Sequence, residues 1–227
     1  MTEPASPAVT RVVLVRHGES LTNAGGKAAD HISNPLTDLG HLQARDFAER
    51  LPCNPTLFVV SPFLRAQQTA EPLRQRFPNV PVEEWPIQEF TFLDPARHRG
   101  TSEEERHPHV LAYWQRRDHA FIDGPGAESF TQFFDRAREA IRRLMSAGPG
   151  GCIVLFSHGY FMQAFRLALL FPNATDAELM ANFQRFHLVN LIQNADSLEF
   201  EVHDGKIRFI GQPRLTGFTL QGEISHA

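Results

Sequence analysis

Three short apolar runs most constrain what this chain can fold into. They cover residues 12–15, 57–60 and 152–156, and most of their side chains are β-branched or aromatic. Unbroken apolar runs of this length are typical of strands that are buried on both faces of a sheet. The segments between them are long enough for helices. The sequence therefore predicts an α/β fold with three layers, in which helices cover both faces of a mostly parallel sheet.

Helix signals follow the first two runs. Thr37 is suited to cap a helix that ends near Leu51. The apolar residues of this helix that are expected to face the core are Leu39, Leu42, Phe47 and Leu51. After the second run, Ser61 is suited to be a cap and Pro62 to be the first residue of a helix that ends near Phe77.

The rest of the chain completes the alternation, with one interruption. Further elements are expected as a strand at 81–84, a helix from Gly159, a helix over 176–186 and two or three strands after 188. Residues 90–127 are polar, with scattered aromatic residues and prolines, and they are interpreted as a small helical insertion over one edge of the sheet. The whole is predicted to be a single domain of residues 11–227 that follows a disordered tail of residues 1–10.

The overall charge argues against two classes of partner. The 227 residues have a formal net charge of −4, so there is no broad basic field to attract nucleic acid or an anionic membrane. No apolar run approaches the roughly 18 to 20 residues of a membrane-spanning helix. The N-terminal residues lack the basic start and apolar centre of a secretory signal, so a cytoplasmic protein is expected. No pattern indicates an oligomeric state.

The chain has two cysteines, Cys53 and Cys152, which lie far apart in the sequence. Cys152 falls within an apolar run, so a buried free thiol is expected, as is usual in a reducing cytoplasm.

Polar residues suited to an anion follow three of the predicted strands. The first run ends on Arg16-His17-Gly18, the second is followed by Ser61 and then Arg65, and the third ends on Ser157-His158-Gly159. In open parallel sheets, ligands bind beyond the carboxyl ends of the strands. Two arginines, two histidines and the N–H groups of helix starts are therefore predicted to face one pocket.

This combination of groups points to a phosphate. Arginine presents a planar fork of donors that matches phosphate oxygens, and a helix start adds free N–H groups. Gly18 and Gly159 would let the backbone approach the anion closely. An unprotonated imidazole is a competent nucleophile, and nearby cations would stabilise a pentacoordinate transition state. His17 is therefore a candidate nucleophile for phosphorus.

Four motifs together resemble one known family. They are RHGES with Asn23 close behind, PLTDLGHLQA, SPFLRAQQTA and SHGYF, and they occur in the order typical of the histidine phosphatase superfamily, the phosphoglycerate-mutase-like proteins. The resemblance implies that His17 is phosphorylated, that Arg16, Arg65 and His158 bind the phosphoryl group, and that Asn23 assists them. It also implies that no metal or other cofactor is needed and that the substrate is a small phosphomonoester.

The general acid is the least secure of these assignments. Ile87-Gln88-Glu89 falls where the family usually has Leu-x-Glu, so the resemblance assigns the proton-donating role to Glu89. The text that follows, FTFLDPARHRG, departs from the family's usual Gly-x-Trp-Glu-Gly-like stretch. The later Gly-Glu-Ser element appears as Ala127-Glu128-Ser129, and Glu128 is the alternative acid.

Two other functions compete with phosphomonoester hydrolysis. A phosphoglycerate mutase must hold a bisphosphate intermediate and needs extra basic residues near the glutamate, and FTFLDP supplies none. A non-catalytic binder of phosphorylated ligands would not need both histidines, both arginines and Glu89. The aromatic residues of the insertion either line a pocket for an apolar leaving group or, as we expect, pack the insertion onto the sheet or form a dimer contact: Phe90, Phe92, Tyr113, Trp114 and Phe121.

Overall fold

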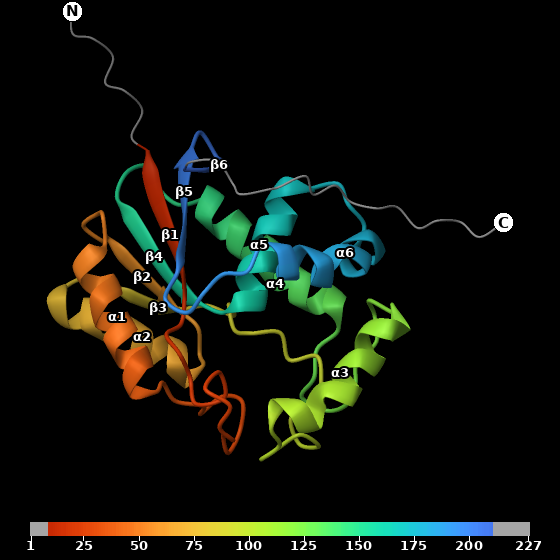
Figure 1. Cartoon of the computed structure of the whole chain (residues 1–227). Coiled ribbons are helices and arrows are strands. Elements are labelled where there is room, and N and C mark those ends of the chain that lie inside the picture. The colour runs from red at the N-terminus through yellow and green to blue at the C-terminus, as the bar shows by residue number, and fades with distance from the viewer. Residues whose placement is uncertain (1–8, 211–227) are drawn as a thin grey trace, which may run out of the picture.

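The computed structural model of the chain describes residues 9–210 (Figure 1). The strands are β1 (Thr10–Arg16), β2 (Leu57–Val60), β3 (Val82–Glu84), β4 (Cys152–Ser157), β5 (Ser197–His203) and β6 (Lys206–Phe209). The helices are α1 (Asp38–Arg50), α2 (Leu64–Arg76), α3 (Glu103–Arg116), α4 (Phe130–Met145), α5 (Gly159–Leu170) and α6 (Asp176–Val189). Residues 1–8, most of the expected N-terminal tail, lie outside the described residues.

The strands form one sheet in the order β3-β2-β4-β1-β5-β6. The first four strands of this order are parallel to one another. β5 runs antiparallel to β1, and β6 antiparallel to β5. The mostly parallel sheet and the strands expected near the C-terminus are thus confirmed.

Alternate residues of the central strands face the two helical layers. Val12 and Leu14 pack with residues of α4, α5 and α6, whereas Val13 and Val15 pack with residues of α1 and α2. All four side chains are fully buried. Figure 1 shows α1 and α2 on one side of the sheet and α4, α5 and α6 on the other. The predicted three-layer arrangement is confirmed.

The buried face of α1 differs from the prediction. Thr37 caps the helix as expected, but Leu39 and Leu42 are 49% and 56% exposed. The helix buries Phe47, as predicted, together with Gly40, Ala44 and Ala48 rather than the two leucines. A Cβ atom on Gly40 would lie only 2.1 Å from the carbonyl oxygen of Glu19, so the glycine lets the helix start approach the loop after β1. This close approach rotates the two leucines toward solvent.

The start of α2 also differs from the prediction. The helix begins at Leu64 with Phe63 as its N-cap, so Ser61 and Pro62 precede it. The Ser61 hydroxyl accepts a hydrogen bond from the Phe63 N–H and pairs with the ring of His158. Ser61 therefore serves the neighbouring strand end rather than the helix.

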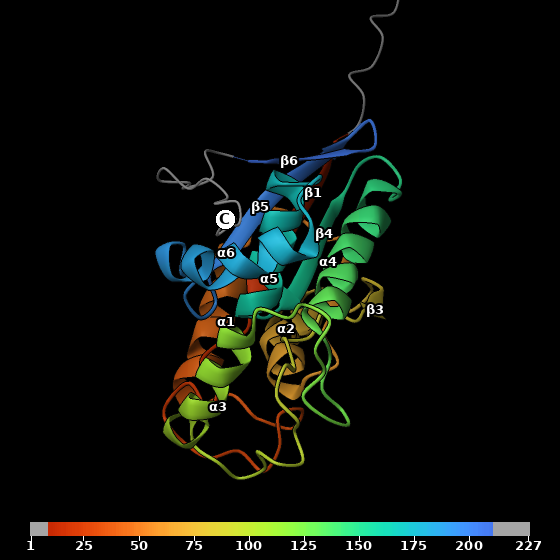
Figure 2. The same cartoon turned by 90° about the vertical axis from the view of Figure 1, so that its right-hand side faces the viewer.

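The sequence suggested that the insertion lies over one edge of the sheet, and this prediction is wrong. Figure 2 shows α3 beyond the carboxyl ends of the strands, below the sheet in that view. Three of its aromatic residues, Phe90, Tyr113 and Trp114, are buried in the core shared with α4 and α6, as expected for packing. Phe90 and Phe92 also line the pocket described below. The insertion is thus placed to cover the candidate site.

Helix α4 was not predicted from the sequence. The Ser129 hydroxyl caps it, and the side-chain oxygen of Gln132 accepts a hydrogen bond from the Ser129 N–H, which completes a capping box. Phe130, Phe133 and Phe134 are fully buried on its inner face.

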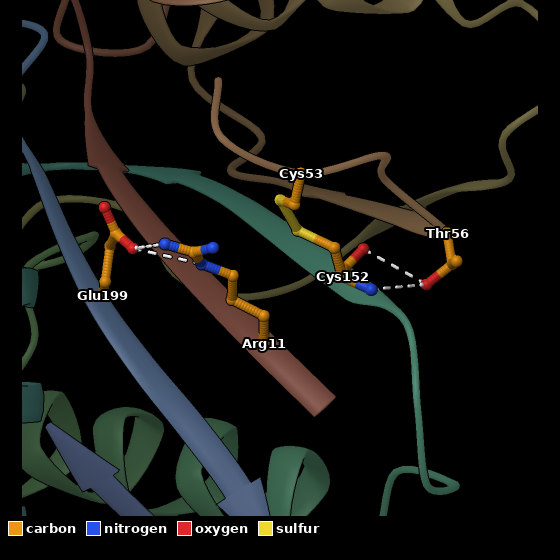
Figure 3. Close-up of a disulfide and its surroundings, with 5 residues drawn as sticks. All are labelled: Arg11, Cys53, Thr56, Cys152 and Glu199. Atoms are coloured by element: carbon orange, nitrogen blue, oxygen red, sulfur yellow. Dashed lines mark hydrogen bonds and ion pairs between the residues drawn. A yellow bond between two sulfur atoms is a disulfide. The ribbon is translucent and has the colours of Figure 1, made fainter. Parts of the chain in front are cut away.

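The two cysteines form a disulfide, so the expectation of free thiols is wrong (Figure 3). Cys53 lies just before β2 and Cys152 begins β4, with 6.4 Å between their Cα atoms, a separation usual for disulfides. The Thr56 N–H donates to the carbonyl of Cys152, and the Cys152 N–H donates to the Thr56 hydroxyl. These bonds bring the loop before β2 beside β4, a pairing that spacing in the sequence could not reveal.

No helix within residues 9–210 is long and apolar enough to cross a membrane.

Candidate active site

Three strand ends meet at the carboxyl edge of the sheet, as predicted. Arg16 is paired with Ser157 in the register of β1 and β4, so His17 and His158 lie beside each other. Their ring centroids are 5.0 Å apart. The end of β2 lies on the other side of β4, which brings Ser61 to His158. Parallel pairing thus gathers residues that lie more than 140 positions apart in the chain.

His17 is held in one tautomer by its surroundings. Its Nδ1 lies 2.7 Å from the carbonyl oxygen of Gly18, which can only accept a hydrogen bond, so Nδ1 carries the proton. Nε2 then has a free lone pair, and it accepts a hydrogen bond of 3.1 Å from Nε of Arg65. Burial, followed by the positive charge of Arg65, holds the pKa of His17 well below its ordinary value. The ring is therefore neutral at neutral pH, and Nε2 can act as a nucleophile.

Arg65 lies in the first turn of α2 and is 3% exposed. Besides His17, it donates from Nη1 to the carbonyl oxygen of His31 at 2.9 Å. Burial lowers its pKa to about 10, against the raising effect of Glu89, so it stays charged at neutral pH. It therefore presents a buried positive charge directly beside the candidate nucleophile.

Arg16 supplies the second positive charge. Its Nη1 donates to the carbonyl oxygen of Ile192 at 2.6 Å, and its buried Nε has no partner among the described residues. Burial lowers its pKa, and Glu89 opposes that shift. A Cβ atom on Gly159 would lie 3.5 Å from Nε of Arg16, so the start of α5 and this guanidinium are in contact. Donors of both kinds, guanidinium and helix start, are thus side by side.

His158 is the N-cap residue of α5 and is fully buried. Its Nε2 lies 2.7 Å from the Ser61 hydroxyl, while its Nδ1 has no partner among the described residues. Burial, with the charge of Arg65 next, holds its pKa well below the ordinary value. A neutral ring here can offer a hydrogen bond to an anion without adding charge.

Glu89 reaches the same place from the segment after β3. Its carboxylate accepts hydrogen bonds from the N–H of Tyr160, at 3.0 Å, and from its neighbour Phe90. Tyr160 is in the first turn of α5, so the carboxylate lies at the positive end of that helix. It also interacts electrostatically with Arg16 and Arg65. The structure therefore brings Glu89 together with the predicted phosphate-binding residues.

Glu128, the alternative acid, is engaged elsewhere. Its two carboxylate oxygens accept bonds of 2.6 and 2.8 Å from Arg136, and one of them also accepts from the N–H of Thr91. Arg136 in turn donates to the carbonyls of Pro86 and Gln88. This pair fixes the segment on both sides of Glu89 and engages both carboxylate oxygens of Glu128.

Asn23 lies in the wall of the pocket rather than against the histidines. Its side-chain oxygen accepts from the Ser20 hydroxyl and from Nδ2 of Asn194. Asn194 also donates to the carbonyl oxygen of His17. No sequence pattern pointed to Asn194 or His31, because each reaches the site through a loop outside the four motifs.

A pocket of about 320 Å³ opens over these residues. Its lining comes from the loop after β1, the segment around Glu89, the insertion and the start of α5: Thr22, Asn23, Ala28, Asp30, His31, Asn34, Glu89, Phe90, Thr91, Phe92, Leu93, Pro95, His98, Arg99, Gly100, Thr101, Arg106, Val110 and Tyr160. The side chains of His17, Arg65 and His158 are buried and do not line it, but Arg65 donates to the carbonyl oxygen of His31, a lining residue. Among the side chains that the structure describes, no cluster of three His, Cys, Asp or Glu is arranged to hold a metal ion.

Comparison with family models gives one match over most of the chain. The model described as histidine phosphatase superfamily (branch 1) matches residues 12–210.

Comparison with individual proteins gives similar results. The chain is 28% identical over 213 residues to a metal-independent phosphoserine phosphatase of Arabidopsis thaliana, which covers 89% of this chain and 86% of that protein. It is 30% identical over 170 residues to a glucosyl-3-phosphoglycerate phosphatase of Mycolicibacterium vanbaalenii, covering 71% of this chain and 75% of the relative. The solved structure of a mycobacterial glucosyl-3-phosphoglycerate phosphatase in complex with VO3 superposes with a TM-score of 0.68, 26% identity, and coverage of 89% of this chain and 98% of that one.

Proposed function

The chain belongs to the histidine phosphatase superfamily, branch 1, and on that premise we propose that it hydrolyses a small phosphomonoester through a phosphohistidine formed on His17. Its phosphatase relatives support a phosphoric monoester hydrolase that acts on small phosphorylated metabolites. The single observation that best supports the mechanism is the state of His17. The ring is neutral, its Nδ1 proton is held by Gly18, and its Nε2 lone pair points at the Arg65 guanidinium.

The phosphoryl group takes the place that donors already surround. Arg65 and Arg16 would bind its oxygens with guanidinium forks, and His158 would add a neutral hydrogen bond. The Gly159 N–H at the start of α5 and the Asn23 amide extend the same set. In this arrangement the Nε–H of Arg65 leaves His17 and binds a phosphoryl oxygen, which frees the nucleophile as the substrate arrives.

The first step transfers the phosphoryl group to the enzyme. Nε2 of His17 attacks phosphorus, a P–N bond forms and the P–O bond to the leaving group breaks. Glu89, in its protonated form, gives its proton to the departing oxygen. The two arginines stabilise the charge that develops on the phosphoryl oxygens in the transition state.

The second step releases phosphate. Glu89, now a carboxylate, removes a proton from water as the water oxygen attacks phosphorus. The P–N bond breaks, inorganic phosphate forms and Glu89 is again protonated. Because Arg16, Arg65 and the helix start supply the positive charge, the proposal requires no metal ion.

Replacement of the nucleophile tests this proposal directly. His17→Ala should abolish turnover of p-nitrophenyl phosphate and should prevent acid-labile labelling by a radioactive phosphomonoester. The matched control is His107→Ala, at an exposed position of α3, which should retain both. Labelling that persists without His17 would remove it as the nucleophile.

Analysis of the products formed from 3-phosphoglycerate separates the competing functions. A mutase given 3-phosphoglycerate would form 2-phosphoglycerate, whereas the proposed hydrolase releases inorganic phosphate, and ³¹P NMR distinguishes the two products. A non-catalytic binder would turn over neither 3-phosphoglycerate nor p-nitrophenyl phosphate.

The proposal also covers the compartment and the domain. We keep the cytoplasm as the proposed compartment, although the Cys53–Cys152 disulfide removes the free-thiol argument for it. Residues 11–227 are proposed to act as one domain with residues 90–127 as its insertion. Cell fractionation tests the first statement, and limited proteolysis tests the second.

A further inference from the structure

The insertion forms one wall of the pocket with the far end of an anchored helix. Helix α3 is fixed at its C-terminal end, where Tyr113 and Trp114 are buried in the core. Toward its N-terminal end, Arg106 and the preceding loop residue Arg99 line the pocket. The opposite wall is the loop after β1, which includes His31. The pocket therefore lies between a helix end that is remote from its anchor and a loop from another part of the chain.

We define the flap as residues 98–109, which comprise the loop before α3 and the first half of that helix. Side-chain hydrogen bonds of the flap stay within it, as between Arg106 and Thr101, with one exception among the side chains that the structure describes. The exception is Glu105, whose two carboxylate oxygens accept bonds of 3.1 and 2.8 Å from Nζ of Lys27 in the opposite loop. A segment with few bonds to its surroundings opens more readily than the core.

Charges of opposite sign face each other across the pocket. Besides the ion pair of Lys27 with Glu105, Asp30 of the loop interacts electrostatically with Arg99 of the flap. No hydrogen bond or ion pair joins Asp30 to Arg99 among the described residues. The side chains of Lys27 and Glu105 are 53% and 52% exposed, so water and dissolved ions reach their ion pair. The two walls thus attract each other through contacts that can form and break in solvent.

We propose that residues 98–109 form a flap that opens and closes over the pocket, and that the ion pair between Lys27 and Glu105 is the latch that holds it closed. This inference rests on the proposed function in one respect, that the substrate reaches His17 through this pocket. Glu89, the proposed acid, lines the pocket, whereas His17 is buried and does not. The leaving group therefore occupies the space beneath the flap, and it enters and leaves when the flap is open.

A latch has a kinetic signature that a binding residue lacks. Lys27 and Glu105 contact each other, so they stabilise the closed flap equally with and without a ligand beneath it. Loss of the latch therefore speeds association and dissociation by the same factor and leaves Kd unchanged. Loss of a side chain that binds the ligand would raise Kd instead, and loss of a lysine that only attracts anions would slow association.

Titration with inorganic phosphate tests the latch in Lys27→Gln. Line shapes in ³¹P NMR spectra give Kd and the dissociation rate constant, and the association rate constant follows from the two. We expect both rate constants to rise about two- to fivefold, the range for an exposed ion pair, with Kd unchanged. The matched control is Lys206→Gln, at the chain's other lysine, which is exposed in β6 and should leave all three values unchanged. Unchanged rate constants in Lys27→Gln, or a change in Kd alone, would overturn the inference.

Charge reversal tests whether the two residues act as a pair. Lys27→Glu places a carboxylate against Glu105 and should raise both rate constants further than Lys27→Gln does. Addition of Glu105→Lys reverses the pair and should return both rate constants toward those of the wild type. Glu105 also accepts a hydrogen bond from the Ser102 N–H, so Lys27 is the position to vary alone. A double variant that exchanges phosphate as fast as Lys27→Glu would overturn the pairing.

The phosphate titration separates this inference from the proposed hydrolysis, because it requires no turnover. If the enzyme does not hydrolyse p-nitrophenyl phosphate, the proposed function fails while the rates of phosphate exchange still decide the flap. If it does hydrolyse that substrate and phosphate exchange does not respond to Lys27→Gln, only the flap inference fails.

Discussion

In the proposed mechanism, the hydrogen bond between Arg65 and His17 is the resting state of the nucleophile. The Nε–H of Arg65 occupies the same lone pair that must attack phosphorus. Phosphoryl oxygens are stronger acceptors for a guanidinium than a neutral imidazole, so under the proposal a bound substrate would replace His17 as the partner of Arg65. The second anchor of Arg65, the carbonyl of His31, holds the guanidinium in place during that exchange.

Glu89→Gln should separate substrates by how much their leaving groups need a proton. An alkyl phosphate expels a strongly basic alkoxide, whereas p-nitrophenyl phosphate expels a stable phenolate, and general acids typically contribute about 10² to 10⁴-fold. In the variant, the rate of the first step should therefore fall far more with the alkyl substrate than with the aryl substrate. Single-turnover measurements on both substrates give this comparison.

Glu128→Gln is the matched control for that prediction. It removes a carboxylate from the same region but breaks the bonds with Arg136. We expect Glu128→Gln to lower the rate of the first step by the same factor for the alkyl and the aryl substrate. Equal losses in Glu89→Gln would contradict the assignment of Glu89 as the acid.

Sequence motifs could identify the candidate phosphate-binding residues but not the residues that hold them in place. Arg16, His17 and His158 each lie at the end of an apolar run, so the strands that position them are visible in the sequence. Asn194 and Arg136 act through contacts with the backbone of other segments, to the carbonyls of His17 and Gln88. Such contacts depend on how distant loops meet, and no local pattern encodes them.

The elements most readily predicted were the buried parallel strands, because their apolar runs are unbroken. Helix α4 escaped prediction although its apolar residues recur at helical spacing and Ser129 begins a capping box. The prediction that Leu39 and Leu42 face the core was wrong because Gly40, not a leucine, makes the closest contact of α1 with the loop after β1. Apolar periodicity predicts which face of a helix is hydrophobic, whereas close approach of the backbone to a neighbouring segment decides which face is buried.

Loss of the Ser129 cap should destabilise α4 measurably. Ser129→Ala removes the hydroxyl that accepts from the Gln132 N–H and is expected to cost about 1 kcal/mol in the free energy of unfolding. Chemical denaturation measures this change. Ser146→Ala, at the exposed other end of the helix, serves as the control, and an equal loss in both variants would argue against the cap.

At the scale of the molecule, the buried histidines make stability depend on pH. The folded state lowers the pKa of His187 to about 4, chiefly by burial and then by Arg16, whereas an unfolded histidine titrates near 6.5. Between those values the unfolded chain binds the proton and the folded protein does not. The contribution of His187 is therefore complete above about pH 6.5 and is lost as the pH falls from there toward about 4.

His187→Gln should make the acid side of the stability curve shallower. As the pH falls from about 6.5 to about 4, the free energy of unfolding of the variant should decrease less steeply than that of the wild type. The difference in slope is up to about 1.4 kcal/mol per pH unit, the value set by one proton. Denaturant titrations at several pH values measure it, and His107→Gln controls for the loss of a histidine as such. A variant curve parallel to that of the wild type would contradict the prediction.

The disulfide also fixes how the chain responds to cutting. It closes a covalent ring from Cys53 to Cys152, with 99 residues of separation, and the insertion lies inside that ring. A protease that cuts once within residues 90–127 therefore opens the ring without dividing the molecule. On a denaturing gel, such nicked protein should run as a single species without reductant and as two fragments after reduction. Two fragments without reductant would mean that the bond is not formed in the isolated protein.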